Sequence, residues 1–266
     1  MAIQDQYGRI GFFEHFNGIA AAATIADATA GTRYNDVVLI AISGDVAMTY
    51  TVDESGGVVG FSGAAGAGDG ITLTSAPMQP STNGVLVAGG RFKVSAATDY
   101  QAFVGWQETV SLSETVIPFT LSGSTLTANA AGSCVGFYYD TTATADGWRF
   151  MAGDGGVAST SGGLDQARTA ATTLGALGVL AGETLTADTW MVWRVEIDPN
   201  GAVRGYFGDE TMANSLSLTL VASLKAGVID QAALHYPIMT LLEASTGDPT
   251  HEVDYFFAKG NMDWAA

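Results

Sequence analysis

The fold class follows from the stretch TWMVWRVEIDPNGAVRGYFGD, residues 189–209. Two runs rich in β-branched and aromatic residues flank its tetrapeptide DPNG, residues 198–201. Proline presets a φ of about −65° at the first central position of a turn, and the Asn-Gly pair that follows tolerates positive φ. Local steric preference therefore reverses the chain here, and the stretch predicts a β-hairpin.

Two more hairpins are predicted from alternating side chains. The segments SCVGFYYD (133–140) and GWRFMAGDGG (147–156) flank a short polar turn. The segments RFKV (91–94) and FVGWQE (103–108) are joined near residues 96–99. Period-two alternation places successive side chains on opposite faces of a strand, so we expect each pair to form an antiparallel ladder.

The C-terminal segment HEVDYFFAKG, residues 251–260, predicts a closing strand. The expected faces are Val253, Tyr255 and Phe257 on one side and Asp254 and Phe256 on the other. Glycine accounts for 34 of the 266 residues, and it separates short apolar runs together with Ser, Thr, Asn and Asp. Short apolar runs separated by turn residues are typical of β-sandwiches and β-barrels, so we predict an all-β chain.

Charge and hydropathy exclude two classes of partner. The chain has 10 basic and 27 acidic residues, a formal charge of −17, which is too acidic to neutralise a run of phosphates. The longest apolar runs, at 37–42 and 85–88, are much shorter than the about 18 residues that span a membrane. We therefore expect neither nucleic-acid nor membrane binding. The acidic surface suits a protein that stays soluble in salt water.

Stabilisation has to come from packing, because Cys134 is the only cysteine and no internal disulfide can form. Residues 19–31, IAAAATIADATAG, are a low-complexity Ala/Thr segment. Composition leaves two interpretations open. The segment is either a loop or short helix that leads into the sandwich, or an arm that pairs with a neighbouring subunit.

Read together, the ordered segments resemble a known family over roughly residues 12–262. The segments are EHF (14–16), GGVVGFSGAAGAGDGITLTS (56–75), GRFKV with FVGWQE, VGFYYD with GWRFMAGDGG, the 189–209 stretch, and EVDYFFAKG (252–260). Their order and spacing resemble the concanavalin A-like, laminin G-like jelly-roll β-sandwich. More narrowly, the chain is similar to virion structural proteins of tailed bacteriophages, especially marine ones.

The resemblance implies a sandwich of two antiparallel sheets, one of them concave. We expect one jelly-roll domain over residues 31–266, preceded by an N-terminal arm or first strand in residues 1–30. An insertion at about 160–184 departs from the family pattern. The implied role is non-enzymatic: a decoration or cement protein on the outer capsid surface of the virion. Its partners would be the major capsid protein and further copies of itself.

The alternative is a carbohydrate-binding, lectin-like head or tail fibre protein that attaches to host surface polysaccharide. Five tryptophans and two tyrosines could form a sugar-stacking platform or could fill the core; they are Trp106, Trp148, Trp190, Trp193, Trp264, Tyr138 and Tyr139. Aromatic residues spaced by two on strands more often fill a core. Trp190 and Trp193 are three residues apart, so a regular strand would point them to opposite faces. Trp264 could anchor the chain end to a neighbour.

An enzyme of this fold would need an acidic triad on alternate residues of one strand. Glu196 and Asp198 alternate in that way, but the next position on the same face, Asn200, already lies in the DPNG turn. The triad is therefore incomplete. We interpret Glu196 as a solvent-facing strand residue and Asp198 as a turn cap, and we predict no catalytic residue.

Metal and nucleophile motifs are also missing. The three histidines, His15, His235 and His251, have no spacing that puts two ring nitrogens on one metal, and there is no G-x-S-x-G sequence. Four aspartates could hold calcium only if their loops converge, and otherwise they are ordinary turn residues: Asp69, Asp140, Asp146 and Asp154. We therefore predict no metal-binding or cofactor-binding residue and no cofactor.

Overall fold

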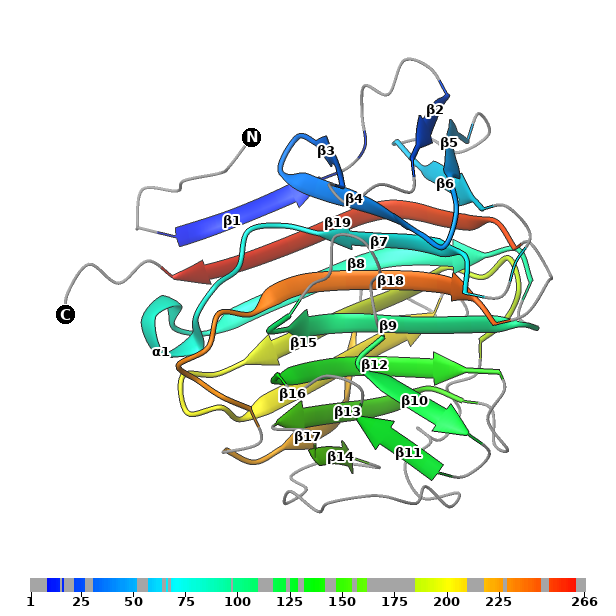
Figure 1. The fold of residues 1–266 in the computed structure, drawn as a ribbon. Coiled ribbons are helices and arrows are strands. Elements are labelled where there is room, and N and C mark those ends of the chain that lie inside the picture. Colours follow the sequence, from blue (N-terminus) through cyan, green and yellow to red (C-terminus); the bar gives the residue numbers. More distant parts are fainter. Residues whose placement is uncertain are drawn as a thin grey trace.

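The computed structural model describes residues 9–14, 16, 22–26, 31–51, 57–63, 66, 68–96, 98–109, 117–122, 125–128, 132–141, 147–154, 157–161, 185–209, 218–226, 229–244 and 249–261. Two large sheets stack face to face in this part of the chain (Figure 1). Every strand pair described is antiparallel. The predicted all-β sandwich of two antiparallel sheets is confirmed.

The nine-stranded sheet has the order β17 (Thr219–Leu224), β16 (Val203–Asp209), β15 (Met191–Ile197), β8 (Leu86–Val94), β19 (His251–Asn261), β6 (Val59–Ser62), β5 (Val46–Tyr50) and β2 (Ala23–Ile25), with β1 (Arg9–Glu14) also paired to β19. The eight-stranded sheet has the order β14 (Val157–Ser161), β13 (Arg149–Asp154), β12 (Cys134–Asp140), β9 (Tyr100–Gln107), β18 (Tyr236–Glu243), β7 (Gly70–Thr74), β4 (Val37–Ile42) and β3 (Thr32–Tyr34).

Two small elements lie outside the large sheets. The hairpin of β10 (Phe119–Ser122) and β11 (Thr125–Ala128) forms its own two-stranded sheet in front of β12 and β13 (Figure 1). The helix α1 (Pro80–Asn83) connects β7 to β8. Among the described residues, no helix is long and apolar enough to cross a membrane.

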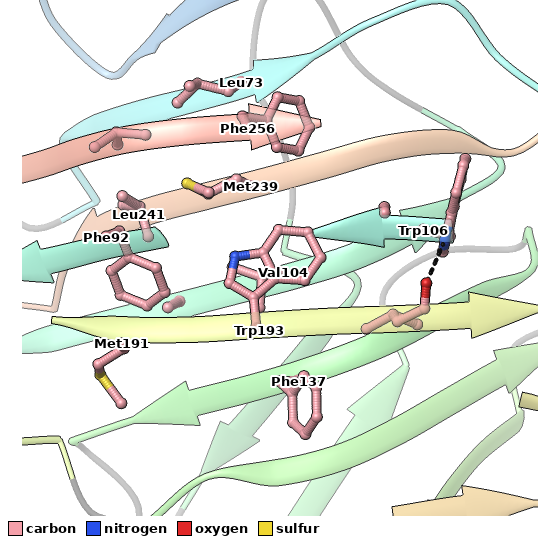
Figure 2. Packing of buried hydrophobic residues seen from close by; sticks show 14 of the residues in the cluster. Leu73, Phe92, Val104, Trp106, Phe137, Met191, Trp193, Met239, Leu241 and Phe256 are labelled. Atoms are coloured by element: carbon pink, nitrogen blue, oxygen red, sulfur yellow. Dashed lines mark hydrogen bonds between the residues drawn. The ribbon is translucent and has the colours of Figure 1, made fainter. Parts of the chain in front are cut away.

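The core lies between the two sheets and is rich in large side chains. Trp106, Trp148 and Trp193 are fully buried, and Figure 2 shows Trp106 and Trp193 in a cluster of aromatic and aliphatic side chains. Trp106 of β9 donates a hydrogen bond from Nε1 to the backbone oxygen of Val195 on β15, at 3.3 Å. This bond joins the two sheets through the core.

Two of the three predicted hairpins are confirmed. In the first, β15 pairs with β16, and Oδ1 of Asp198 accepts hydrogen bonds from the backbone N–H groups of Asn200 and Ala202 at 2.8 and 3.0 Å. Asp198 is therefore the turn cap that the sequence predicts. In the second, β12 pairs with β13 from Cys134↔Gly153 to Tyr138↔Arg149.

The predicted hairpin of β8 and β9 is wrong. β8 pairs with β15 and β19 in one sheet, whereas β9 pairs with β12 and β18 in the other. Residues 95–99 therefore cross from sheet to sheet. Alternation identifies a strand and its buried face, but it carries no information about which strand lies beside it.

The predicted faces of β19 are partly wrong: Tyr255 and Phe257 do share a face opposite Phe256, but Val253 lies on the same side as Phe256. The register shifts between Val253 and Tyr255, and Val253, Phe256 and Ala258 are the residues that reach the core. An extra residue in one strand breaks strict alternation. Tyr255 and Phe257 consequently lie on the outer face of the sheet, where both are half-buried.

The N-terminal region contributes strands to the nine-stranded sheet of its own chain. β1 pairs with β19, and Phe12 and Phe16 lie in the core. Within the Ala/Thr segment, β2 pairs with β5. The boundary between residues 1–30 and the domain 31–266 stays a prediction, and nearly all of the expected insertion, residues 162–184, lies outside the described residues.

Candidate functional site

A cleft of about 340 Å³ opens between β1 and one end of the eight-stranded sheet. We call it the β1–β18 cleft. Its lining residues are Gly11, Phe12, Arg33, Asp36, Val38, Ser75, Ala76, Pro77, Met78 and Tyr236. They come from β1, the β3–β4 hairpin, the loop after β7 and the start of β18. The cleft thus combines segments more than 200 residues apart in sequence.

The polar wall of the cleft is the tight turn between β3 and β4. Tyr34 pairs with Val37, which leaves Asn35 and Asp36 as a two-residue turn. Asn35 has a φ of 50°, a conformation that asparagine tolerates better than most residues. Nε of Arg33 donates to the backbone oxygen of Asn35 at 3.2 Å. The turn therefore holds one cation and one carboxylate, Arg33 and Asp36, beside each other.

The buried carboxylate of Glu14 fixes this turn to β1. Its Oε2 accepts a hydrogen bond from Nδ2 of Asn35 at 2.9 Å, and its Oε1 accepts one from the backbone N–H of Phe16 at 2.8 Å. Burial raises the pKa of Tyr34, and the negative charge of Glu14 raises it further. Tyr34 also stacks on Phe16, with ring centroids 5.9 Å apart. Glu14 thus positions the cleft wall without lining the cleft.

The opposite wall carries a buried hydroxyl group. Ser75 is 6% exposed, and its Oγ has no hydrogen-bond partner in the structure. The loop that carries it is anchored by Met78 and His235, whose backbone groups exchange two hydrogen bonds of 2.8 and 2.7 Å. A buried hydroxyl without a partner is destabilising by about 1–3 kcal/mol, and a bound ligand or water with a polar group satisfies it.

Chemically, the cleft offers an apolar floor and a polar rim. Apolar surface comes from Phe12, Val38, Ala76, Pro77 and Met78. Hydrogen-bonding groups come from Arg33, Asp36, Ser75 and Tyr236. Small-molecule sites usually have this composition, with apolar walls and a few polar groups that orient the ligand. The cleft therefore suits a ligand with both an apolar face and hydroxyl groups.

Comparison with known proteins identifies the architecture. In sequence, the chain matches no family model and no curated protein. In structure, it is similar to the winged bean acidic lectin in complex with methyl-α-D-galactose, at 8% identity and a TM-score of 0.50, over 91% of this chain and 98% of the lectin. The CBM2 module of the evolved Dit of Lactobacillus casei BL23 phage J-1 is similar at 10% identity and a TM-score of 0.50, over 97% and 99%.

The fold is a concanavalin A-like jelly roll. At these identities the similarity concerns the jelly-roll architecture alone, because unrelated functions share such folds. The site has to be argued from this chain's own residues.

Glu196 takes part in ion pairs and a hydrogen bond with neighbouring side chains. Its carboxylate lies 3.1 Å from Nε of Arg194 and 4.0 Å from Nη1 of Arg204, and its Oε2 accepts a hydrogen bond from the hydroxyl of Tyr206 at 3.2 Å. These contacts lie on the outer face of the nine-stranded sheet. With Asp198 bound to its own turn, the two carboxylates have the structural roles that the sequence predicts.

The proposed aromatic platform is wrong for every member that the structure describes. Trp106, Trp148, Trp190, Trp193, Tyr138 and Tyr139 are all less than 5% exposed. Trp190 and Trp193 do point to opposite faces: Trp193 lies in the core, and the cations of Arg91 and Lys93 cover the Trp190 ring at 4.3 and 4.9 Å. Trp264 lies outside the described residues.

Asp69 and Asp140, the two of the four aspartates whose side chains the structure describes, do not converge on one ion. Asp140 lies at one end of β12, and the backbone of Asp154 lies beside the other end. Six strand residues separate the two ends of β12, which is about 20 Å. Asp69 lies three strands from Asp140, about 14 Å away. Asp146 is outside the described residues, and the described ones contain no group of three His, Cys, Asp or Glu able to hold a metal.

The histidines are also far apart. His235 precedes β18 at the Gln107 end of β9, and His251 packs against Tyr100 at the other end. Both are buried, and His15 lies outside the described residues. The sequence analysis missed the cleft residues Arg33, Asp36, Ser75 and Tyr236. The only sequence signal for them is the dipeptide Asn35-Asp36, which marks a turn but not a binding site.

Proposed function

We propose that this protein binds carbohydrate, and that the β1–β18 cleft holds the sugar. The carrying observation is the composition of the cleft, in which apolar side chains lie beside the polar residues Arg33, Asp36 and Ser75. A sugar ring presents an apolar face and a rim of hydroxyl groups, and this arrangement offers a partner for each.

Two further facts support the proposal. The jelly roll is shared with a lectin bound to a galactoside and with a carbohydrate-binding module of a phage Dit. Attachment to host surface polysaccharide is also the alternative role that the family resemblance of the sequence suggests. We propose further that the protein acts on a bacteriophage virion in attachment to the host. Decoration of the capsid through the major capsid protein stays a prediction. We favour carbohydrate binding over it as the function of this protein.

Glycan-array screening followed by calorimetry tests the proposal. We expect binding to at least one host-type glycan. Arg33→Ala or Ser75→Ala should weaken it at least about tenfold, because losing a hydrogen bond to a charged or buried group changes binding by about 1.5 kcal/mol or more. Arg204→Ala, on the opposite side of the nine-stranded sheet, is the matched control. Absence of any glycan ligand, or equal affinity in the cleft variants, would refute the proposal.

A further inference from the structure

The outer face of the nine-stranded sheet gathers half of the basic residues of the whole chain. The chain has 10 Lys and Arg residues, and five of them lie on this face: Arg91 and Lys93 on β8, Arg194 on β15, Arg204 on β16 and Lys259 on β19. Strand register brings them together, since Lys259, Val87, Glu196 and Arg204 lie in one row across four strands. We call this surface the β8–β16 face.

Three carboxylates interleave with these cations. Nη1 of Arg91 lies 2.9 Å from Asp254, Nζ of Lys93 lies 3.0 Å from Glu252, and Glu196 contacts both Arg194 and Arg204. Five cations and three carboxylates make the face nearly neutral, with a local charge of +2 in a chain of −17. The rest of the molecule is correspondingly more acidic.

Aromatic rings fill the spaces between these charges. The guanidinium of Arg194 lies 3.9 Å from the ring centre of Tyr206, and Tyr255 packs beside Phe257 with ring centroids 6.3 Å apart. Gly89 allows the Phe257 ring to lie against β8, because a Cβ there would come within 2.6 Å of it. Tyr, Trp and Arg are the residue types enriched in protein interfaces and in their energetic centres.

We propose that the β8–β16 face is the interface between two copies of this chain. Two molecules of charge −17 repel, and screening at physiological salt reduces this repulsion beyond about 8 Å. Contact through the nearly neutral face keeps the acidic surfaces of the two copies apart. Because four of the five cations lie beside a carboxylate, a two-fold axis lets the carboxylates of one copy meet the guanidinium groups of the other.

The size of the face is close to that of a stable interface. Five neighbouring strands, β17, β16, β15, β8 and β19, span about 24 Å, and seven residues of each strand span a similar length. The flat area of these strands is about 600 Å², and protruding side chains add to it. A stable interface buries about 800 Å² per partner. The β1–β18 cleft uses none of the charged residues of this face.

Light scattering on the full chain tests the proposal. From about 1 μM to about 100 μM at near-physiological salt, we expect the mass to reach twice the chain mass of 27.4 kDa. Arg194→Glu should raise the dimer dissociation constant at least about tenfold, because it sets like charges against each other. Arg33→Glu makes the same change of charge in the cleft and should leave the dimer intact.

Circular dichroism and thermal melting establish that each variant is folded. Should Arg194→Glu fail to fold, Arg204→Glu probes the same face at a side chain that is 45% exposed. A chain that stays monomeric throughout the range overturns the proposal, and so does an Arg194→Glu variant that dimerises like the original. If the chain is a monomer and binds polygalacturonate through Arg194, the face is a binding site for an anionic glycan. That result would also overturn the proposal of a dimer interface.

Discussion

At the scale of single residues, His251 makes stability depend on pH. It is fully buried, neither ring nitrogen has a hydrogen-bond partner in the structure, and burial lowers its pKa from 6.5 to about 3. Between these values the unfolded chain binds a proton that the folded chain rejects. The folded state is therefore fully stabilised above pH 6.5 and loses stability as the pH falls toward 3, by at most about 1.4 kcal/mol per pH unit from this group.

His251→Gln removes this titration. Urea unfolding of both proteins at several pH values between 7 and 4 gives the difference in unfolding free energy, in which the acidic groups common to both cancel. We expect the variant to lose less stability on acidification than the original protein. Parallel curves would show that His251 does not contribute to the acid sensitivity.

At the scale of elements, Phe119 packs the β10–β11 hairpin against the eight-stranded sheet. The hairpin pairs with no other described strand, and Phe119 packs against Phe103 and Tyr138 with ring centroids 5.9 and 6.2 Å away. Phe119→Ala should destabilise the docked hairpin by about 3 kcal/mol, because truncation of a buried ring leaves a cavity. Faster hydrogen exchange confined to residues 117–128 is the expected readout. Phe119→Leu, which keeps much of the apolar volume, should have a smaller effect, and unchanged exchange in both variants would contradict this role.

At the scale of the whole molecule, the two proposals together predict avidity. A pair joined through the β8–β16 face presents two β1–β18 clefts, so a polysaccharide surface can occupy both at once. Linked sites bind more tightly than either site alone by roughly a hundredfold or more when the geometry permits. Arg194→Glu should therefore weaken binding to immobilised polysaccharide strongly and leave affinity for a soluble monovalent sugar unchanged. Surface plasmon resonance compares the two, and an equal loss in both formats would contradict the prediction.

The sequence by itself determined the features that depend on neighbours in the chain. The DPNG turn, the capping role of Asp198, the β12–β13 hairpin and the all-β class follow from local steric preference and period-two alternation. The strongly acidic charge is likewise a property of composition.

Only the tertiary structure decided which strands and side chains meet. It separated β8 from β9, shifted the faces of β19 by one residue, brought Glu14 to Asn35 and Arg91 to Asp254, and assembled the cleft from four segments. Alternation shows which face of a strand is buried but not which strand lies beside it, because partners are chosen by packing and register over the whole sandwich.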